Sequence, residues 1–123
     1  MWLFTRYGLF SVVCARQGDG SHGIPVDPDR MMVRARVAKH LEALKSRFPA
    51  KLSESEIVTT AYTDYACRLF VAKANWVRVA AALAEETDYD NFKKAAETRK
   101  GNEGIEYLNA LHAVWGVKNK LQR

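Results

Sequence analysis

The hydrophobic residues change their spacing part-way along the chain, and this change constrains the fold more than any other feature of the sequence. In the first part they recur mostly at every second residue, which is typical of β-strands. Towards the C-terminus they recur at every third or fourth residue, which is typical of amphipathic helices. A chain of 123 residues suits one domain with one hydrophobic core. The sequence therefore predicts a single α+β domain over residues 1–123.

The strands are predicted from aromatic and β-branched composition. Segment 2–15 is rich in both types, and we expect a short first segment ending near Tyr7 and a strand from Leu9 to Ala15. Residues 17–30 hold three glycines and two prolines and are predicted to form a loop. Two further strands are predicted at 56–62 and 65–72, joined by a Thr-Asp turn.

Residues 31–48 support two interpretations. An Asp-Pro pair at 27–28 is typical of a helix start, so one long helix from that point is the alternative. However, small apolar residues alternate with Arg34 and Arg36, which favours a half-buried strand. We predict a strand at 31–37 and a helix at 38–48, ended by the proline that follows.

Helices are predicted near 76–83, 92–98 and 105–121, with Asn75 as the cap of the first. The element order is then ββαββααα, an antiparallel sheet of about four strands with helices packed on one face. We expect core packing for the three tryptophans Trp2, Trp76 and Trp115, with an interface as the alternative for Trp2 near the terminus. His112 of the last helix is expected at the edge of the core.

Several motifs occur along the chain: Met-Trp-Leu-Phe-Thr-Arg-Tyr-Gly at 1–8, Val-Arg-Ala-Arg at 33–36, Thr-Asp-Tyr at 63–65 and Asp-Tyr-Asp-Asn-Phe-Lys at 88–93. With these motifs the chain resembles, over nearly its whole length, a group of small uncharacterised bacterial proteins. The resemblance implies a bacterial, cytoplasmic protein and no particular mechanism. It also favours the strand at 31–37.

Charge and composition narrow the classes of partner. The chain carries 19 Lys and Arg against 14 Asp and Glu, a net charge of +5. This excess suits nucleic acid, an acidic protein or an anionic ligand, although a solvated surface of mixed charge gives the same count. No apolar run reaches the roughly 18 residues of a membrane span, so no membrane contact is expected. Cys14 and Cys67 lie in apolar runs and are predicted to be buried free thiols.

Three arginines of the predicted sheet form the first candidate site. Arg34, Arg36 and Arg68 are expected on the face opposite the apolar positions, where planar guanidinium groups suit phosphate or carboxylate. Tyr65 and Phe70 are expected to add stacking surfaces there. The alternative is a solvated face with cross-strand pairs to Asp or Glu.

The second candidate surface consists of Asp88, Tyr89, Asn91 and Lys93. The carboxylates of Asp88 and the nearby Asp90, with the amide of Asn91, are ligands of hard cations, but calcium loops need more oxygen donors. A helix cap by Asp88 or Asp90 explains the segment more simply. The histidines are not at metal-ligand spacing, and the glycines of the long loop lack the ending of a phosphate-binding loop, so neither a metal nor a cofactor is expected.

Three hypotheses about function stay open. The first is a non-catalytic interaction module, homodimeric or bound to a protein partner. The second is a module that binds nucleic acid or another anionic ligand through the arginines. The third is an enzyme with an unrecognised site, whose only candidate groups are Asp64, Asp88, Asp90 and His112.

Overall fold

The computed structural model describes residues 1–98 and 104–122, and the chain divides into two compact units, Met1–Thr87 and Asp88–Arg123. We call these unit 1 and unit 2. Unit 1 contains β1 (Trp2–Thr5), β2 (Gly8–Arg16), β3 (Val26–Ala35), α1 (Ala38–Arg47), α2 (Pro49–Leu52), β4 (Val58–Thr59), β5 (Cys67–Ala72) and α3 (Lys73–Glu85). Unit 2 contains α4 (Phe92–Thr98), α5 (Gly104–Lys118) and the short 3₁₀ helix η1 (Asn119–Gln122).

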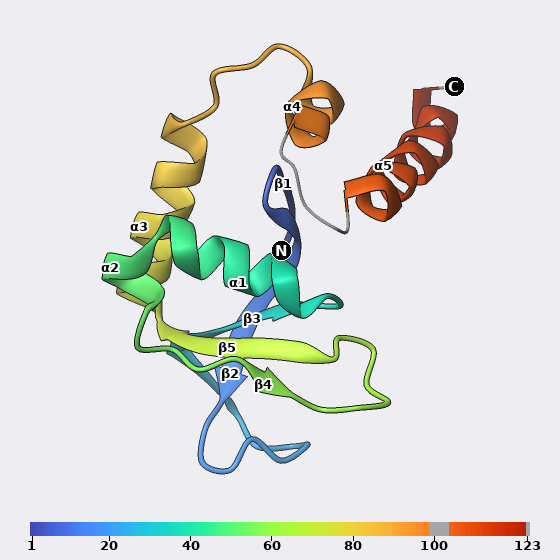
Figure 1. Cartoon of the computed structure of the whole chain (residues 1–123). Coiled ribbons are helices and arrows are strands. Elements are labelled where there is room, and N and C mark those ends of the chain that lie inside the picture. Colours follow the sequence, from blue (N-terminus) through green and yellow to red (C-terminus); the bar gives the residue numbers. More distant parts are fainter. Residues whose placement is uncertain (99–103, 123) are drawn as a thin grey trace. The chain divides into compact units, whose positions relative to one another are not determined.

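The strands of unit 1 form one antiparallel sheet in the order β1-β2-β3-β5-β4, which confirms the predicted α+β class (Figure 1). The sheet has five strands rather than four, because the short first segment pairs with β2 as a strand of its own. The turn between them depends on Gly8, whose φ of +146° is one that side chains rarely allow. A Cβ atom on Gly8 would lie 2.3 Å from Cγ of His40, so the glycine also makes room for that ring.

The segment with two interpretations, residues 31–48, contains the end of strand β3 followed by helix α1. The alternative of one long helix is wrong. β3 begins at Val26, inside the predicted loop, because its first residues still pair with the end of β2. The β2–β3 register shifts between Cys14 and Ala15, which pair with Met31 and Asp27. The intervening residues, among them the proline at 28, fall at this irregularity, where a proline removes no ladder hydrogen bond.

Two local predictions need correction, and a third is confirmed with an addition. The strand predicted at 56–62 is only Val58–Thr59, and both residues are exposed at the edge of the sheet. Asn75 does not cap a helix, because α3 follows β5 directly and starts at Lys73. The proline at 49 ends α1 as predicted, but it also occupies the first position of α2, where its missing N–H is not needed.

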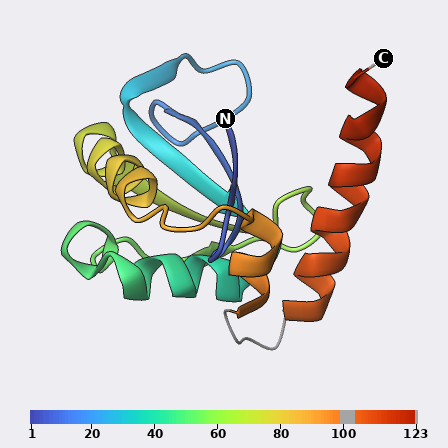
Figure 2. The ribbon, with the colours of Figure 1, turned by 90° about the horizontal axis from the view of Figure 1, so that it is seen from above.

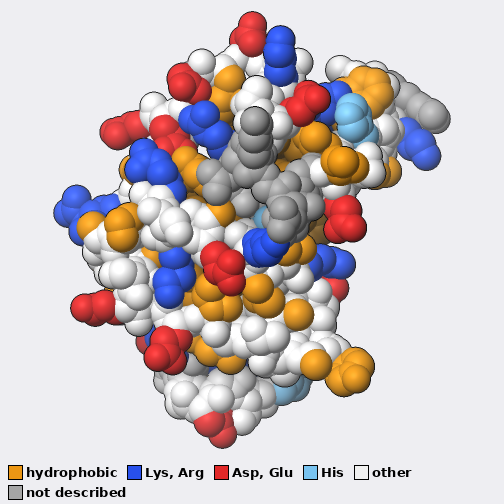
Figure 3. All heavy atoms as spheres, in the orientation of Figure 1, with side chains coloured by type: hydrophobic (Ala, Val, Ile, Leu, Met, Phe, Trp, Pro, Cys, Tyr) orange, Lys and Arg blue, Asp and Glu red, His pale blue; other side chains and the backbone are white. Residues whose placement is uncertain are grey.

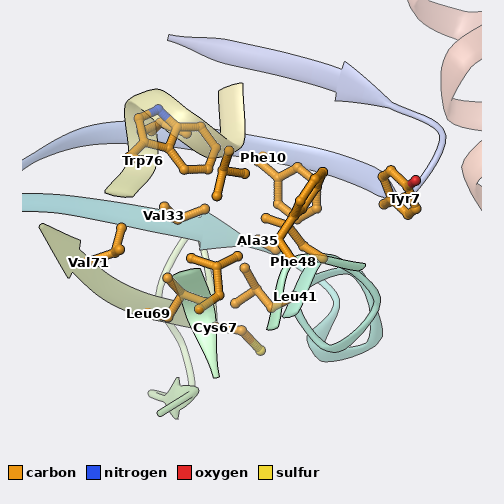
Figure 4. Close-up of a cluster of buried hydrophobic side chains, with 14 residues drawn as sticks. Tyr7, Phe10, Val33, Ala35, Leu41, Phe48, Cys67, Leu69, Val71 and Trp76 are labelled. Carbon is orange, nitrogen blue, oxygen red and sulfur yellow. The ribbon is translucent and has the colours of Figure 1, made fainter. Parts of the chain in front are cut away.

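The core of unit 1 lies between one face of the sheet and the helices α1 and α3 (Figures 1, 2 and 4). Alternate strand residues point into it, so the predicted packing of helices on one face is confirmed. Trp76 is 3% exposed and packs there as predicted. The largest fully buried apolar side chains are Phe10, Leu41, Leu44, Leu52, Leu69, Val33 and Val79.

A polar cluster around Glu86 fastens the C-terminal end of α3 to two distant segments. The phenol of Tyr7 donates a hydrogen bond of 2.6 Å to one carboxylate oxygen, and Nη2 of Arg47 lies 2.9 Å from the other. Nη2 of Arg6 donates to the backbone carbonyl of Glu86 at 2.7 Å. Burial, and then the neighbouring carboxylate, raise the pKa of the Tyr7 phenol above its ordinary value.

In unit 2, the predicted positions of one tryptophan and one histidine are wrong. Trp115 is 50% exposed and His112 is exposed, although both fall on the apolar stripe of the predicted helix. α4 is capped by Asn91, whose Oδ1 accepts a hydrogen bond of 3.0 Å from the backbone N–H of Lys94. The segment before α4 therefore caps the helix as predicted, but with a different residue.

Candidate functional site

Three residues form a straight row across the middle of the sheet of unit 1. Ser11 of β2 pairs with Arg34 of β3, and Arg34 pairs with Arg68 of β5. Their neighbours Val33 and Leu69 are fully buried in the core, so the side chains of the row project from the opposite face. We call this the outer face. Strand alternation places Arg34 of β3 and Arg68 of β5 there, as predicted, whereas Arg36 lies just beyond the end of β3.

The two central guanidinium groups are held by neutral partners. Nη2 of Arg34 donates a hydrogen bond of 2.7 Å to Oγ of Ser11. Nη2 of Arg68 lies 3.3 Å from the carbonyl oxygen of Tyr65 and 3.4 Å from Oγ1 of Thr63. Within the described part of the chain, the buried Nε atoms of both arginines lack a hydrogen-bond partner. Each guanidinium group is thus fixed in place with unused donor capacity.

Aromatic rings lie against the arginines of the outer face. The guanidinium carbons of Arg34 and Arg36 lie 4.7 Å and 5.0 Å from the ring centre of Tyr65. Arg30 lies 4.3 Å from the ring centre of Phe70. Contacts of this kind restrict the long arginine side chains and favour their stacking on the rings.

A groove with a volume of about 650 Å³ runs over this face. Its floor is formed by outer-face side chains of three strands and its rim by the loop after β2. Asp19 is the one carboxylate among its described lining residues, and it accepts hydrogen bonds of 2.9 Å and 2.5 Å from the backbone N–H and the hydroxyl of Ser21. The side-chain hydrogen bond is the main cause that lowers the pKa of Asp19. The lining includes Val13, Arg16, Arg30, Met32, Arg34, Arg68 and Phe70.

The groove has an excess of positive charge. None of Arg30, Arg34 and Arg68 forms an ion pair with a carboxylate of the described residues. Like charges directly opposite each other on neighbouring strands are destabilising. By contrast, acidic and basic side chains are interspersed over the surface that Figure 3 shows. The groove is therefore suited to an anion.

The structure brings most of the first predicted site together. Arg34, Tyr65 and Arg68 lie in contact or in register. Arg36 lies over the same tyrosine ring but also forms an ion pair of 3.0 Å with Asp64. Both members of that pair are largely exposed, so it contributes little to stability. Sequence reasoning missed Ser11 and Arg30. Arg30 lies four residues before Arg34 and therefore on the same face of β3, but the sequence places residue 30 in a loop, where alternation is not considered.

Local structure accounts for most of the second predicted surface. Asn91 caps α4, and the ring of Tyr89 lies 6.1 Å from that of Phe92. Nζ of Lys93 lies 5.1 Å from the ring centre of Trp115. Asp88 is exposed and has its own partners. These contacts favour the helix-cap interpretation over a cation site.

The groups proposed for catalysis or metal binding are placed as follows. Asp64 is engaged by Arg36, and Asp90 is exposed in unit 2. In the two described ranges no three His, Cys, Asp or Glu side chains lie together in a way that could hold a metal ion. Cys14 and Cys67 are both free thiols; Cys67 is buried as predicted, but Cys14 is only half-buried. None of the helices described has the length and apolar character needed to cross a bilayer.

Comparison with known proteins gives no relative from which a function could be transferred. No family model, no curated protein and no solved structure matches the chain. The interpretation of the groove therefore depends on its own geometry and charge.

Proposed function

We propose that the chain is a non-catalytic binding module and that the outer face of its sheet binds an anionic group between Arg34 and Arg68. One observation carries the proposal. Two arginines face each other across neighbouring strands with unused buried donors and with no carboxylate paired to them among the described residues. An anion placed between them would offset the repulsion and accept hydrogen bonds from the two guanidinium groups.

The chemistry of the side chains indicates which anions suit the groove. A guanidinium group presents its N–H donors as a planar fork that matches the oxygens of phosphate or carboxylate. Ser11 and Tyr65 hold Arg34 from two directions, so little side-chain freedom is lost when a ligand binds. The groove volume of about 650 Å³ lies within the range of small-ligand pockets.

The other expectations from the sequence stay predictions. The lining supplies cations and apolar surface, and the hydroxyl of Ser11 holds one of these cations, which supports binding rather than catalysis. The alternative is that the module binds a protein partner or a second copy of the chain. Light scattering coupled to gel filtration would show whether the chain forms a dimer. Bacterial origin and a cytoplasmic location follow only from the resemblance noted above.

Thermal unfolding in inorganic pyrophosphate tests the proposal. At a ligand concentration of ten times Kd, binding raises the free energy of unfolding by about 1.4 kcal/mol, which raises Tm by several degrees. Because phosphates also stabilise proteins non-specifically, sodium chloride of equal ionic strength and variant proteins serve as references.

The variants separate specific binding from a general effect of charge. We expect the double variant Arg34→Gln/Arg68→Gln to lose the shift in Tm. The control Arg78→Gln removes an exposed cation from α3 and should keep it. An equal shift in the double variant and the original protein would overturn the proposal.

A further inference from the structure

We infer that the anion is the phosphodiester backbone of a single-stranded nucleic acid and that Trp2 stacks on one of its bases. This inference rests on the proposed function and names the ligand class. It begins from a tryptophan that the sequence predicts to be in the core but that is 70% exposed.

Strand register places Trp2 in the same row as the two arginines. Trp2 of β1 pairs with Ser11, and from Ser11 the row continues through Arg34 to Arg68. The next residue, Leu3, packs against the core from the inner face, so the indole of Trp2 belongs to the outer face. One line across four strands therefore carries a ring, a hydroxyl and two guanidinium groups.

The spacing of the row suits alternating bases and phosphates. Neighbouring strands lie about 4.8 Å apart, so the backbones of Trp2 and Arg34 are separated by roughly 10 Å. Both side chains are long and reach across part of that distance. An extended strand of nucleotides can therefore rest a base on the indole while a nearby phosphate meets the arginines.

The exposed ring distinguishes this ligand from other anions. Every base offers a flat face to an aromatic side chain, with about 1–3 kcal/mol per stacked base, whereas a duplex keeps these faces inside its stack. An acidic peptide would pair its carboxylates with Arg34 and Arg68, but an acidic side chain offers no flat ring to stack on an exposed indole. Phosphates meeting neighbouring guanidinium groups also explain why the row carries no carboxylate.

Binding of a labelled twelve-nucleotide oligothymidylate, followed by fluorescence anisotropy at low salt, tests the inference. A duplex of the same length and a twelve-residue oligoglutamate serve as competitors. We expect the single strand to bind more tightly than either, with an affinity that falls steeply as salt rises. Trp2→Leu should weaken binding roughly 5- to 150-fold, and Trp2→Phe should weaken it less, because the ring is retained.

Matched variants and a second readout keep the result interpretable. Trp115→Leu removes an exposed tryptophan of unit 2 and should bind as the original protein does. Trp76 is buried, so in a Trp115→Phe background any quenching of tryptophan fluorescence on binding reports on Trp2. This measurement needs no substitution of Trp2 itself.

The outcomes separate the two proposals. Unchanged oligonucleotide affinity in Trp2→Leu, absent quenching, or equal binding of oligoglutamate would overturn the inference about nucleic acid. If pyrophosphate still stabilises the protein through Arg34 and Arg68 in those cases, the proposed anion site survives. If pyrophosphate fails as well, the proposed function fails with it.

Discussion

Arg34 and Arg68 are cross-strand partners, with Cα atoms opposite each other on β3 and β5 and side chains on the face away from the core. Pairs of like charge in this position weaken a sheet. In unit 1 the pair is surrounded by a hydroxyl, carbonyl and aromatic groups rather than by carboxylates of the described residues. The pair thus carries a local cost in stability, which an anion bound as we propose would offset.

The repulsion within this pair predicts how stability responds to salt. Sodium chloride screens like charges, so it should raise Tm more in the original protein than in Arg34→Gln. We expect the difference to correspond to about 1 kcal/mol or less. Calorimetry at low and high salt measures it. Arg78→Gln, with its cation on α3, should retain the original salt response, and equal responses in all three proteins would contradict this account.

Replacing Tyr7 by Phe should make stability less sensitive to alkaline pH. The native pKa of this phenol is raised above its ordinary value of 10.0, chiefly by burial and then by Glu86. Above pH 10 the unfolded chain loses this proton while the folded protein retains it, so stability falls as pH rises. The contribution of the phenol is fully present below pH 10 and is lost as pH rises through the native pKa.

Denaturant unfolding of both proteins over a pH series provides the measurement. At neutral pH Tyr7→Phe should cost about 1.5–3 kcal/mol, the range for a hydrogen bond to a charged group. The gap between the two proteins should narrow well above pH 10. A gap of constant size across the alkaline range would show that the phenol does not titrate as we expect.

Gly8→Ala should be among the most damaging single substitutions in unit 1. The backbone φ of +146° and the imidazole of His40 both oppose a Cβ atom, so we expect a loss of roughly 2–5 kcal/mol. Gly20→Ala is the matched control, since its φ is +79° but no atom lies within 4 Å of the added carbon. Its cost should be about 1–2 kcal/mol. Equal losses in urea unfolding would exclude the role of His40.

Asn91→Ala should destabilise α4 by about 1 kcal/mol, because the backbone N–H of Lys94 loses its side-chain acceptor. Hydrogen exchange of the Lys94 amide reports this directly and should become faster. Asp90→Ala leaves that hydrogen bond in place and should leave the exchange rate nearly unchanged. Faster exchange in Asp90→Ala alone would show that the aspartate, and not Asn91, caps α4.

The outer face was predictable because alternation determines which side chains share a face. Arg34 and Arg68 needed only the period of their strands to be assigned correctly. The full groove was not predictable. Whether the arginines find carboxylate partners depends on register between strands, and Ser11 enters the site only because it lies opposite Arg34.

Other errors have physical causes of the same kind. Trp2 was predicted to be buried because a large apolar side chain usually is, but an edge strand leaves one side of it without neighbours. Asn75 has the right chemistry for a cap, yet β5 leads into α3 two residues earlier. The Glu86 cluster joins residues 39 and 79 positions apart in sequence, which no local pattern reveals.

The long sequence separation of the Glu86 contacts also bears on the order of folding. Tyr7 and Arg47 can meet this carboxylate only when segments far apart in sequence have been brought together. Loop-closure entropy makes such contacts late events, so they belong to the native side of the transition state. We expect substitutions at Glu86 to accelerate unfolding while leaving the refolding rate nearly unchanged. Glu86 would then determine how long unit 1 stays folded rather than how quickly it folds.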